Sequence, residues 1–231
     1  MKRCVETTVG AVLICLAAAP ALALGPVDGE VGVIYWANEY DSSGGTTVLD
    51  SVDSAAPGFR AELWLLDRYG IRAGMYGSDL DDLDMESSEQ MSVDLLWRAF
   101  SPTSNNFFAV GAGWQETDLS TIGLDGDTSG ARVGVEGRVS AGVVYFYGQG
   151  SYFPSLKDAE SSSGVDGRFE EMEGHEYEVG VSWKMMPFVS LRAGYRVHSV
   201  DFVRTDFDLL GTTVAGNAET AGYLAGLTVR F

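Results

Sequence analysis

Side-chain character alternates with a period of two through most of the chain, and this feature most constrains the fold. In the segment GIRAGMYG (70–77), Ile71 and Ala73 fall on one face and Arg72 on the other. Successive side chains of a strand point to opposite faces, so the pattern predicts strands with two differently solvated faces. Ten such segments are found, at residues 30–40, 59–67, 70–77, 91–100, 107–115, 131–140, 143–152, 175–184, 189–198 and 222–231.

The connections between these segments alternate in length. Short turns are expected near 67–70, 101–106, 140–142 and 185–187, and long polar loops near 41–56, 78–90, 116–130, 154–174 and 201–219. Bacterial outer-membrane barrels have short periplasmic turns and longer extracellular loops, and strands of about ten residues are long enough to cross a bilayer when tilted. The sequence therefore predicts an all-β, up-and-down antiparallel transmembrane β-barrel of about ten strands, with eight strands as the alternative.

Aromatic residues favour this membrane barrel over a soluble, lipocalin-like barrel. A soluble barrel would turn its apolar face inward and its charged face outward. Here the polar faces are rich in Gly, Tyr and opposite charges, while the apolar faces carry aromatic rings near the strand ends. The rings expected at the membrane interfaces are those of Trp97, Trp114, Trp183, Tyr195 and Phe231.

The first 23 residues have the layout of a cleaved secretory signal peptide. Two basic residues precede an apolar stretch at 9–19, and a small-residue cleavage site ends at Ala23. The apolar stretch is shorter than the roughly 20 residues of a membrane-spanning helix. We expect residues 24–231 to form a single β-barrel domain in the outer membrane of a Gram-negative bacterium.

Cleavage would change both the cysteine count and the charge. The two cysteines, Cys4 and Cys15, would leave with the signal, which excludes disulfides and cysteine-based zinc sites from the mature chain. Loss of Lys2, Arg3 and Glu6 would leave 13 basic and 32 acidic side chains, a net charge of −19. So acidic a protein is not expected to bind nucleic acid.

The closing segment, GYLAGLTVRF (222–231), ends on an aromatic residue. It resembles the C-terminal signal of outer-membrane barrels, which the barrel-assembly machinery recognises. The resemblance implies an assembly signal at Tyr223, Leu227, Val229 and Phe231, with Phe231 on the lipid face at the periplasmic interface.

The last 90 or so residues contain further short motifs. They are Tyr-Phe-Pro at 152–154, Pro187 within a tight turn, and Ala-Gly-Tyr-Arg at 193–196. With these motifs the chain resembles the YfaZ family of small predicted outer-membrane proteins. The resemblance implies the same fold and location, and no particular activity.

Charged side chains on the polar faces are predicted to meet inside the barrel as an ion-pair network, because a buried charge is tolerated only when it is paired. The candidates are Arg60, Glu62, Arg72, Asp94, Arg98, Arg132, Glu136, Arg138, Glu178, Lys184, Arg192, Arg196 and Arg230, with Glu30 and Glu176 on the same face. Such a network would fill and hold the barrel, or alternatively line a selective polar pathway. Bulky Trp64, Tyr76, Tyr145 and Tyr147 on that face argue against a wide pore, in line with the size of a ten-stranded barrel.

The five long loops carry 23 acidic and three basic residues, which predicts solvated, self-repelling loops. A second interpretation is loose binding of Ca²⁺ or Mg²⁺ near the lipopolysaccharide surface, because these cations prefer oxygen ligands. Its candidate ligands are Asp79, Asp81, Asp82, Asp84, Asp125 and Asp127. The segment 124–130 lacks the third ligand and bidentate Glu of an EF-hand loop, so no firm metal site and no other cofactor is expected.

Catalysis finds little support in the sequence. The only histidines are His175 and His198. His198 could form a pair with Asp201, but Ser199 points to the opposite strand face, so His198 and Ser199 cannot form a dyad. We therefore expect no enzyme activity.

The function expected from the sequence is a structural or interaction role, with a charge-filled lumen and acidic extracellular loops. The alternatives are a small passive or selective channel and a rim-located enzyme acting on lipid or peptide. The expected partners are outer-membrane lipid, lipopolysaccharide and, during biogenesis, the barrel-assembly machinery.

Overall fold

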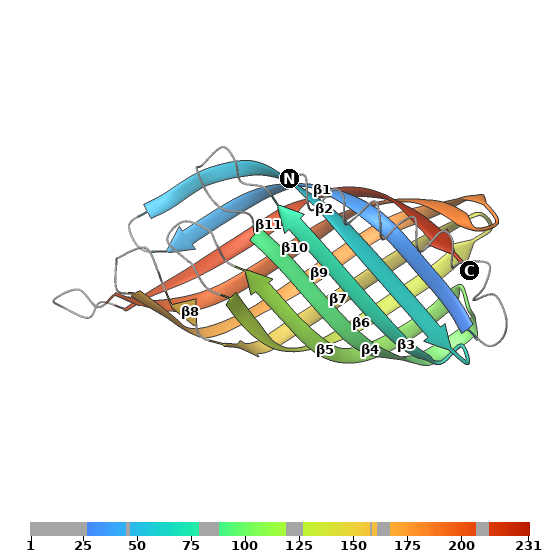
Figure 1. Cartoon of the computed structure of the whole chain (residues 1–231), viewed down its shortest axis with the longest axis horizontal. Coiled ribbons are helices and arrows are strands. Elements are labelled where there is room, and N and C mark those ends of the chain that lie inside the picture. The colour runs from blue at the N-terminus through green and yellow to red at the C-terminus, as the bar shows by residue number, and fades with distance from the viewer. Residues whose placement is uncertain are drawn as a thin grey trace.

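Ten long antiparallel strands form a tilted barrel in the computed structural model, which describes residues 27–44, 47–78, 88–118, 127–157, 159–160, 167–206 and 213–231 (Figure 1). The long strands are β1 (Val27–Gly44), β2 (Thr47–Leu65), β3 (Tyr69–Ser78), β4 (Ser88–Thr103), β5 (Asn106–Asp118), β6 (Asp127–Ala141), β7 (Val144–Leu156), β9 (Gly167–Met186), β10 (Val189–Asp206) and β11 (Thr213–Arg230). A two-residue strand, β8 (Ala159–Glu160), pairs only with the start of β9. Within these described ranges, no helix is long and apolar enough to span a membrane.

The sheet closes on itself through its first and last strands. Strands β1 and β11 pair in register from Glu30 opposite Arg230 to Gly44 opposite Gly216. Every other long strand pairs with its neighbours along the chain, and β7 pairs with β9. The prediction of ten strands is confirmed and the alternative of eight is wrong.

Short turns gather at one end of the barrel, together with the C-terminus, at the right in Figure 1. They lie at 66–68, 104–105, 142–143 and 187–188, close to the predicted positions. The first turn has positive φ at Leu66 (55°) and Asp67 (53°), as in the primed turns that suit hairpin twist. It comes slightly earlier than predicted, because Tyr69 and Gly70 already pair with β2.

The opposite rim differs from the prediction, because much of three expected loops is strand. Strands β1 and β2 extend into 41–56, β9 begins at Gly167, and β10 and β11 occupy most of 201–219. An antiparallel ladder is held by backbone hydrogen bonds, so it can continue where the side chains are no longer apolar. The apolar pattern marks the part of each strand that faces lipid, and it therefore underestimates strand length.

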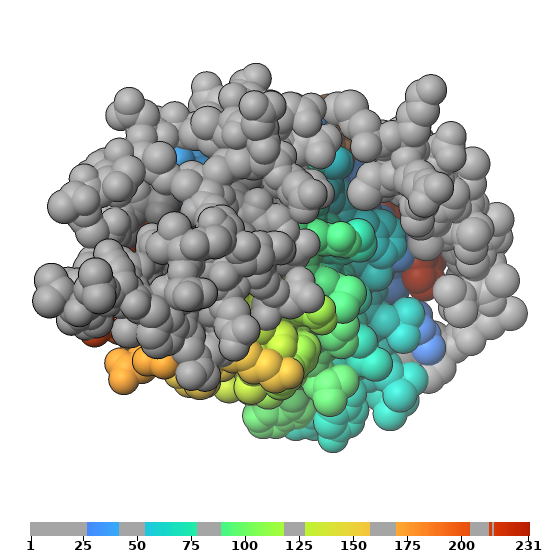
Figure 2. Space-filling view, turned by 60° about the vertical axis from the view of Figure 1, so that its left-hand side comes forward, coloured from blue at the N-terminus to red at the C-terminus, as the bar shows by residue number. Residues whose placement is uncertain are grey.

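The outer face of the barrel is apolar on every long strand. Leu95 is 65% exposed and Val139 is 63% exposed. One exposed apolar residue from each long strand is Tyr35, Leu63, Ile71, Leu95, Phe108, Val133, Phe146, Val179, Leu191 and Leu227. Part of this wall, from β2 to β6, is seen in cyan to yellow-green in Figure 2. A soluble monomer rarely exposes apolar patches beyond a few hundred Å², so the soluble-barrel alternative is wrong.

Exposed aromatic rings lie toward both ends of this apolar wall. Those toward the short turns are Tyr69, Trp97, Phe100, Phe108, Phe146, Trp183 and Phe188. Those toward the long loops are Tyr35, Trp114, Tyr152, Tyr177, Tyr195 and Tyr223. Two such belts are the arrangement found at the two interfaces of outer-membrane barrels.

Candidate functional site: the charged barrel interior

The interior of the barrel is charged, the reverse of a soluble core. Among the residues whose side chains are described, seven arginines are buried there, Arg60, Arg72, Arg98, Arg132, Arg138, Arg192 and Arg196. Six carboxylates are buried with them, Glu30, Glu62, Asp94, Glu136, Glu176 and Glu178. All of them occupy the inward positions that the alternation predicts.

Gln149 on β7 joins strands from opposite sides of the lumen. Its Oε1 accepts hydrogen bonds from Arg60 on β2 at 2.7 Å and from Arg72 on β3 at 2.9 Å. Its Nε2 donates to Glu178 on β9 at 3.1 Å. Arg72 also donates to Asp94 at 2.7 and 3.0 Å and to Glu136 on β6 at 2.9 Å. These contacts cross the axis of the barrel at mid-height.

Arg138 and Arg192 extend the network toward the short turns. Arg138 on β6 donates to Glu30 on β1 at 3.1 Å, and to Glu62 and Glu136 at 3.2 Å each. Arg192 on β10 donates to Glu178 at 2.7 Å and lies 3.8 Å from Glu30. Each of these guanidinium groups therefore neutralises at least two carboxylates.

Arg132 and Arg196 extend the network toward the long loops. Arg132 forms an ion pair with Asp94 at 3.0 Å and donates to Gln115 at 3.1 Å. Arg196 on β10 donates to Glu176 at 2.9 Å and, across the lumen, to Gln90 on β4 at 2.7 Å.

Aromatic rings flank several of the lumen guanidinium groups. The guanidinium of Arg192 lies 3.8 Å from the ring centre of Tyr147, and that of Arg196 lies 3.7 Å from Tyr76. Arg98, the seventh arginine, lies between Trp64 at 3.9 Å and Phe107 at 4.2 Å. Such cation–π contacts stabilise a desolvated cation without a carboxylate.

Arg98 therefore differs from the prediction. Its acidic neighbour in the described structure is the exposed Asp67, 3.6 Å away in the β2–β3 turn, rather than a buried carboxylate. Lys184 was also expected in the network, but it is exposed at the end of β9, because the strand there has passed the rim. It forms no ion pair with any described residue.

Arg230 closes the short-turn mouth. It donates to Asp28 on β1 at 2.6 and 3.0 Å. It also donates to Asn105 in the β4–β5 turn, which lies on the other side of the mouth. Arg230 thus links β1 to the β4–β5 turn across this opening.

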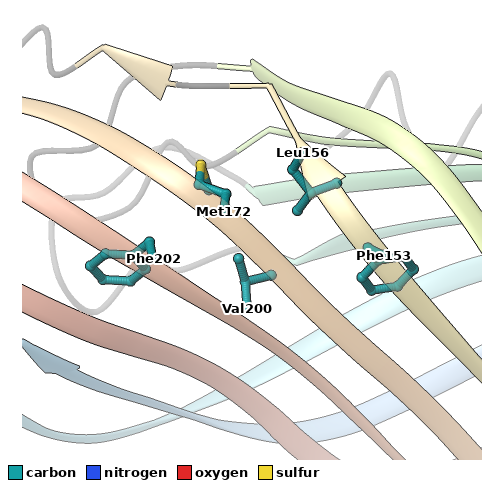
Figure 3. Close-up of a cluster of buried hydrophobic side chains, with 5 residues drawn as sticks. All are labelled: Phe153, Leu156, Met172, Val200 and Phe202. Carbon is teal, nitrogen blue, oxygen red and sulfur yellow. The ribbon is translucent and has the colours of Figure 1, made fainter.

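Apolar side chains cover the charged layers at both ends. At the short-turn end, Trp64, Leu96, Phe107 and Ala109 form a buried cluster. At the long-loop end, a second cluster projects from β7, β9 and β10 and contains Phe153, Leu156, Met172, Val200 and Phe202 (Figure 3). Phe153 is fully buried. The ion pairs are enclosed between apolar layers, which strengthens them electrostatically.

The two histidines lie in different surroundings. His198 is buried on the lumen side, where its Nε2 lies 2.9 Å from Gln115 Nε2 and its ring contacts Phe153. His175 is on the outer side and stacks on Tyr177. The two imidazole rings therefore lie on opposite faces of the sheet.

The candidate cation ligands lie largely outside the described residues. Asp79, Asp81, Asp82, Asp84 and Asp125 fall in undescribed segments, and of Asp127 only the backbone is described. Among the residues whose positions are described, no group of three His, Cys, Asp or Glu side chains is arranged to hold a metal ion.

The predicted assembly signal occupies the outer face of β11. Tyr223 is 75% exposed and Leu227 is exposed, whereas Val229 is buried between neighbouring strands. The ring of Phe231 lies over Gly29 of β1, and the backbone N–H and C=O groups of these two residues bond reciprocally at 2.9 Å.

Sequence reasoning missed several interior residues. The bridging role of Gln149 was not predicted, although it shares the strand face of Tyr145 and Tyr147. Trp36, Gln90, Phe107 and Ser151 were not considered. Their positions in the strands could have revealed them, because each is adjacent in sequence to a residue on the lipid-facing side and must therefore face the lumen.

Comparison with solved structures identifies the architecture. The outer membrane protease OmpT from Escherichia coli matches with a TM-score of 0.61 at 10% sequence identity, over 91% of this chain and 99% of that chain. The fold is that of an outer-membrane β-barrel. An outer membrane channel from Pseudomonas putida F1 gives a TM-score of 0.46 at 12% identity, over 90% of this chain and 97% of that one.

OprG from Pseudomonas aeruginosa gives a TM-score of 0.39 at 9% identity, over 89% of this chain and 95% of that one. No protein-family model matches the sequence, and no curated protein matches it either. The likeness to the outer membrane protease shows the fold of this chain.

Proposed function

We propose that this outer-membrane barrel is closed to solutes and has a structural or interaction role, carried out by its outer wall and its acidic long-loop rim. The observation that carries the proposal is the set of cross-lumen contacts centred on Gln149, which ties β7 to β2, β3 and β9. A solute would have to break several charge-assisted bonds to pass, and unpaired charges in so dry an interior are costly.

Conductance measurements test this proposal. Purified protein inserted into a planar lipid bilayer should give no discrete current steps, while a general porin in the same bilayer serves as the positive control. A matched variant, Gln149→Gly, removes the bridge and should give at most rare openings. Regular steps from the unaltered protein would contradict the proposal and favour the small selective channel.

A rim-located enzyme is the weaker candidate. His198 lies against Gln115 and Phe153 in the interior, and Ser199 next to it is bonded to Asn217. This arrangement supports a structural use of His198. Incubating His198→Ala and unaltered protein with lipid and peptide substrates should give no turnover that depends on the histidine.

The partners are proposed on the basis of the rim. Carboxylates at the long-loop end oppose each other directly, the exposed Asp41 with the half-buried Glu219, and Asp201 with Glu173, which are both exposed. Like charges in direct opposition destabilise a strand pair, and divalent cations shared with lipopolysaccharide would relieve the repulsion. Recognition by the barrel-assembly machinery and kinship with the YfaZ family stay predictions.

A further inference from the structure

A hollow of about 430 Å³ lies in the outer wall of the barrel near the short turns. It lies over β4 to β7, and apolar side chains form its walls. The lining residues used below are Phe100, Phe108, Gly137, Val139, Phe146 and Gly148. Phe100, Phe108, Val139 and Phe146 are exposed side chains of the lipid-facing wall.

Two outward-facing glycines make the floor of this hollow. Gly137 and Gly148 are direct cross-strand partners, and the same row continues to Phe108 on β5 and Val179 on β9. The row from Phe108 to Val179 covers three strand spacings, roughly 14 Å. Two missing side chains in the middle of this row leave a depression between two apolar walls.

Neither glycine is required by its own backbone or neighbours. A Cβ at Gly137 would come no closer than 4.0 Å to another atom, the carbonyl oxygen of Phe107. A Cβ at Gly148 would be 3.8 Å from Val179. The inward-facing Gly194 differs, because a Cβ there would be 2.6 Å from the carbonyl oxygen of Val179. Glycine in a strand with open space above it suits close approach of another molecule.

We propose that the hollow binds one acyl chain of a phospholipid in the periplasmic leaflet. The hollow belongs to the lipid-facing wall, and it lies toward the short turns, which face the periplasm in outer-membrane barrels. Aromatic and aliphatic walls around a backbone floor offer a hydrocarbon chain dense van der Waals contact. The chain fills space that side chains fill elsewhere on the wall.

Native mass spectrometry of the full-length protein, extracted from outer membranes in mild detergent, tests the proposal. The unaltered protein should retain one phospholipid through detergent exchange. The double variant Gly137→Leu with Gly148→Leu fills the hollow and should lose that lipid. The control variant Ala73→Leu with Ala193→Leu also places two leucine side chains on the outer wall, away from the hollow, and should retain the lipid.

Heat-modifiable migration on gels checks that every variant is folded. If the leucine pair fails to fold, Phe108→Ala with Phe146→Ala removes the walls instead and should also lose the lipid. The proposal is overturned if the unaltered protein retains no phospholipid, or if the hollow-filling variant retains as much as the unaltered protein. It is equally overturned if cross-linking shows a dimer that the leucine pair abolishes, because a second copy would then be the occupant.

Discussion

Glu178 shows how a single carboxylate of the interior depends on its neighbours. Its side chain has no exposure to solvent, and it accepts hydrogen bonds from Arg192 at 2.7 Å and from Gln149 at 3.1 Å. Arg192 supplies the nearest opposite charge, while Gln149 is neutral. Arg60 and Arg196 attract the same carboxylate more weakly, so Arg192 makes the largest single contribution to its stabilisation.

Replacing Arg192 by leucine should lower the free energy of unfolding by about 3–5 kcal/mol, because it leaves Glu178 buried with a neutral donor. Urea titration of the protein in lipid vesicles, followed by tryptophan fluorescence, measures the change. Arg98→Leu is the matched control, since Arg98 lies between two rings and its ion pair within the described residues is with the exposed Asp67. The Arg98→Leu variant should lose only about 0.5–2 kcal/mol of unfolding free energy, which is the range of cation–π contacts. Equal losses in the two variants would contradict this account.

At the same scale, the sequence predicts which residues face the lumen but not which residues meet. Strand parity is a local property and places Arg60 and Gln149 inward independently. Their contact across the barrel depends on its curvature and strand stagger, which no local pattern encodes. The prediction for Lys184 was wrong because the alternation of side chains continues to the rim of the barrel. At the rim, a side chain on the inner face is no longer enclosed by other strands.

The seam between β1 and β11 is the element on which closure depends. Phe231 continues the pairing beyond the end of β11, through two backbone hydrogen bonds of 2.9 Å to Gly29. Its ring occupies the space above Gly29, where a side chain would collide with it. Glycine is used here because the two strands need the ring and the backbone in close contact.

Phe231→Ala should therefore lower the amount of protein in the outer membrane while only mildly weakening refolding into detergent. The ring is half-buried, so its loss should cost less than the roughly 1.5–3 kcal/mol of a fully buried large side chain. Gly29→Leu, which displaces the same ring, should have a similar effect. Cell fractionation measures the amount of protein in the outer membrane, and heat-modifiable migration on gels measures refolding into detergent. Normal outer-membrane levels of Phe231→Ala would refute the assembly signal.

Strand faces and turn positions could be predicted at the scale of elements, whereas strand ends could not. The alternation of apolar and polar residues reflects contact with lipid, and it fades where Ser42 or Gly174 lies beyond the apolar belt. Backbone pairing nevertheless continues there, with Ser42 opposite Ala218 and Gly174 opposite Val200. Predicted loops at 41–56, 154–174 and 201–219 were too long for this reason.

The whole molecule has one end with short turns and one with acidic, longer connections. This asymmetry predicts an orientation in the membrane, with the short turns on the periplasmic side. The predicted cleavage after Ala23 would remove both cysteines of the chain, and single cysteines introduced elsewhere could then be labelled selectively.

A membrane-impermeant maleimide applied to intact cells should label Lys157→Cys, at the long-loop end, and spare Ser101→Cys, near the β4–β5 turn. Both native side chains are exposed, so the difference reports the side of the membrane and not burial. Labelling of both sites after the outer membrane is permeabilised is the control. The reverse pattern on intact cells would show that the barrel has the opposite orientation.

The long sequence separation of the interior ion pairs has a consequence for folding kinetics. Glu30 near the start of the barrel is neutralised by Arg138 and Arg192, which come more than one hundred residues later. A half-formed sheet would expose uncompensated charges to hydrocarbon, where each is costly. Insertion, ring closure and charge neutralisation should therefore occur in one cooperative step with a high barrier. Such non-local pairing also makes spontaneous folding and insertion slow. A catalyst of assembly should therefore increase the folding rate of this chain strongly.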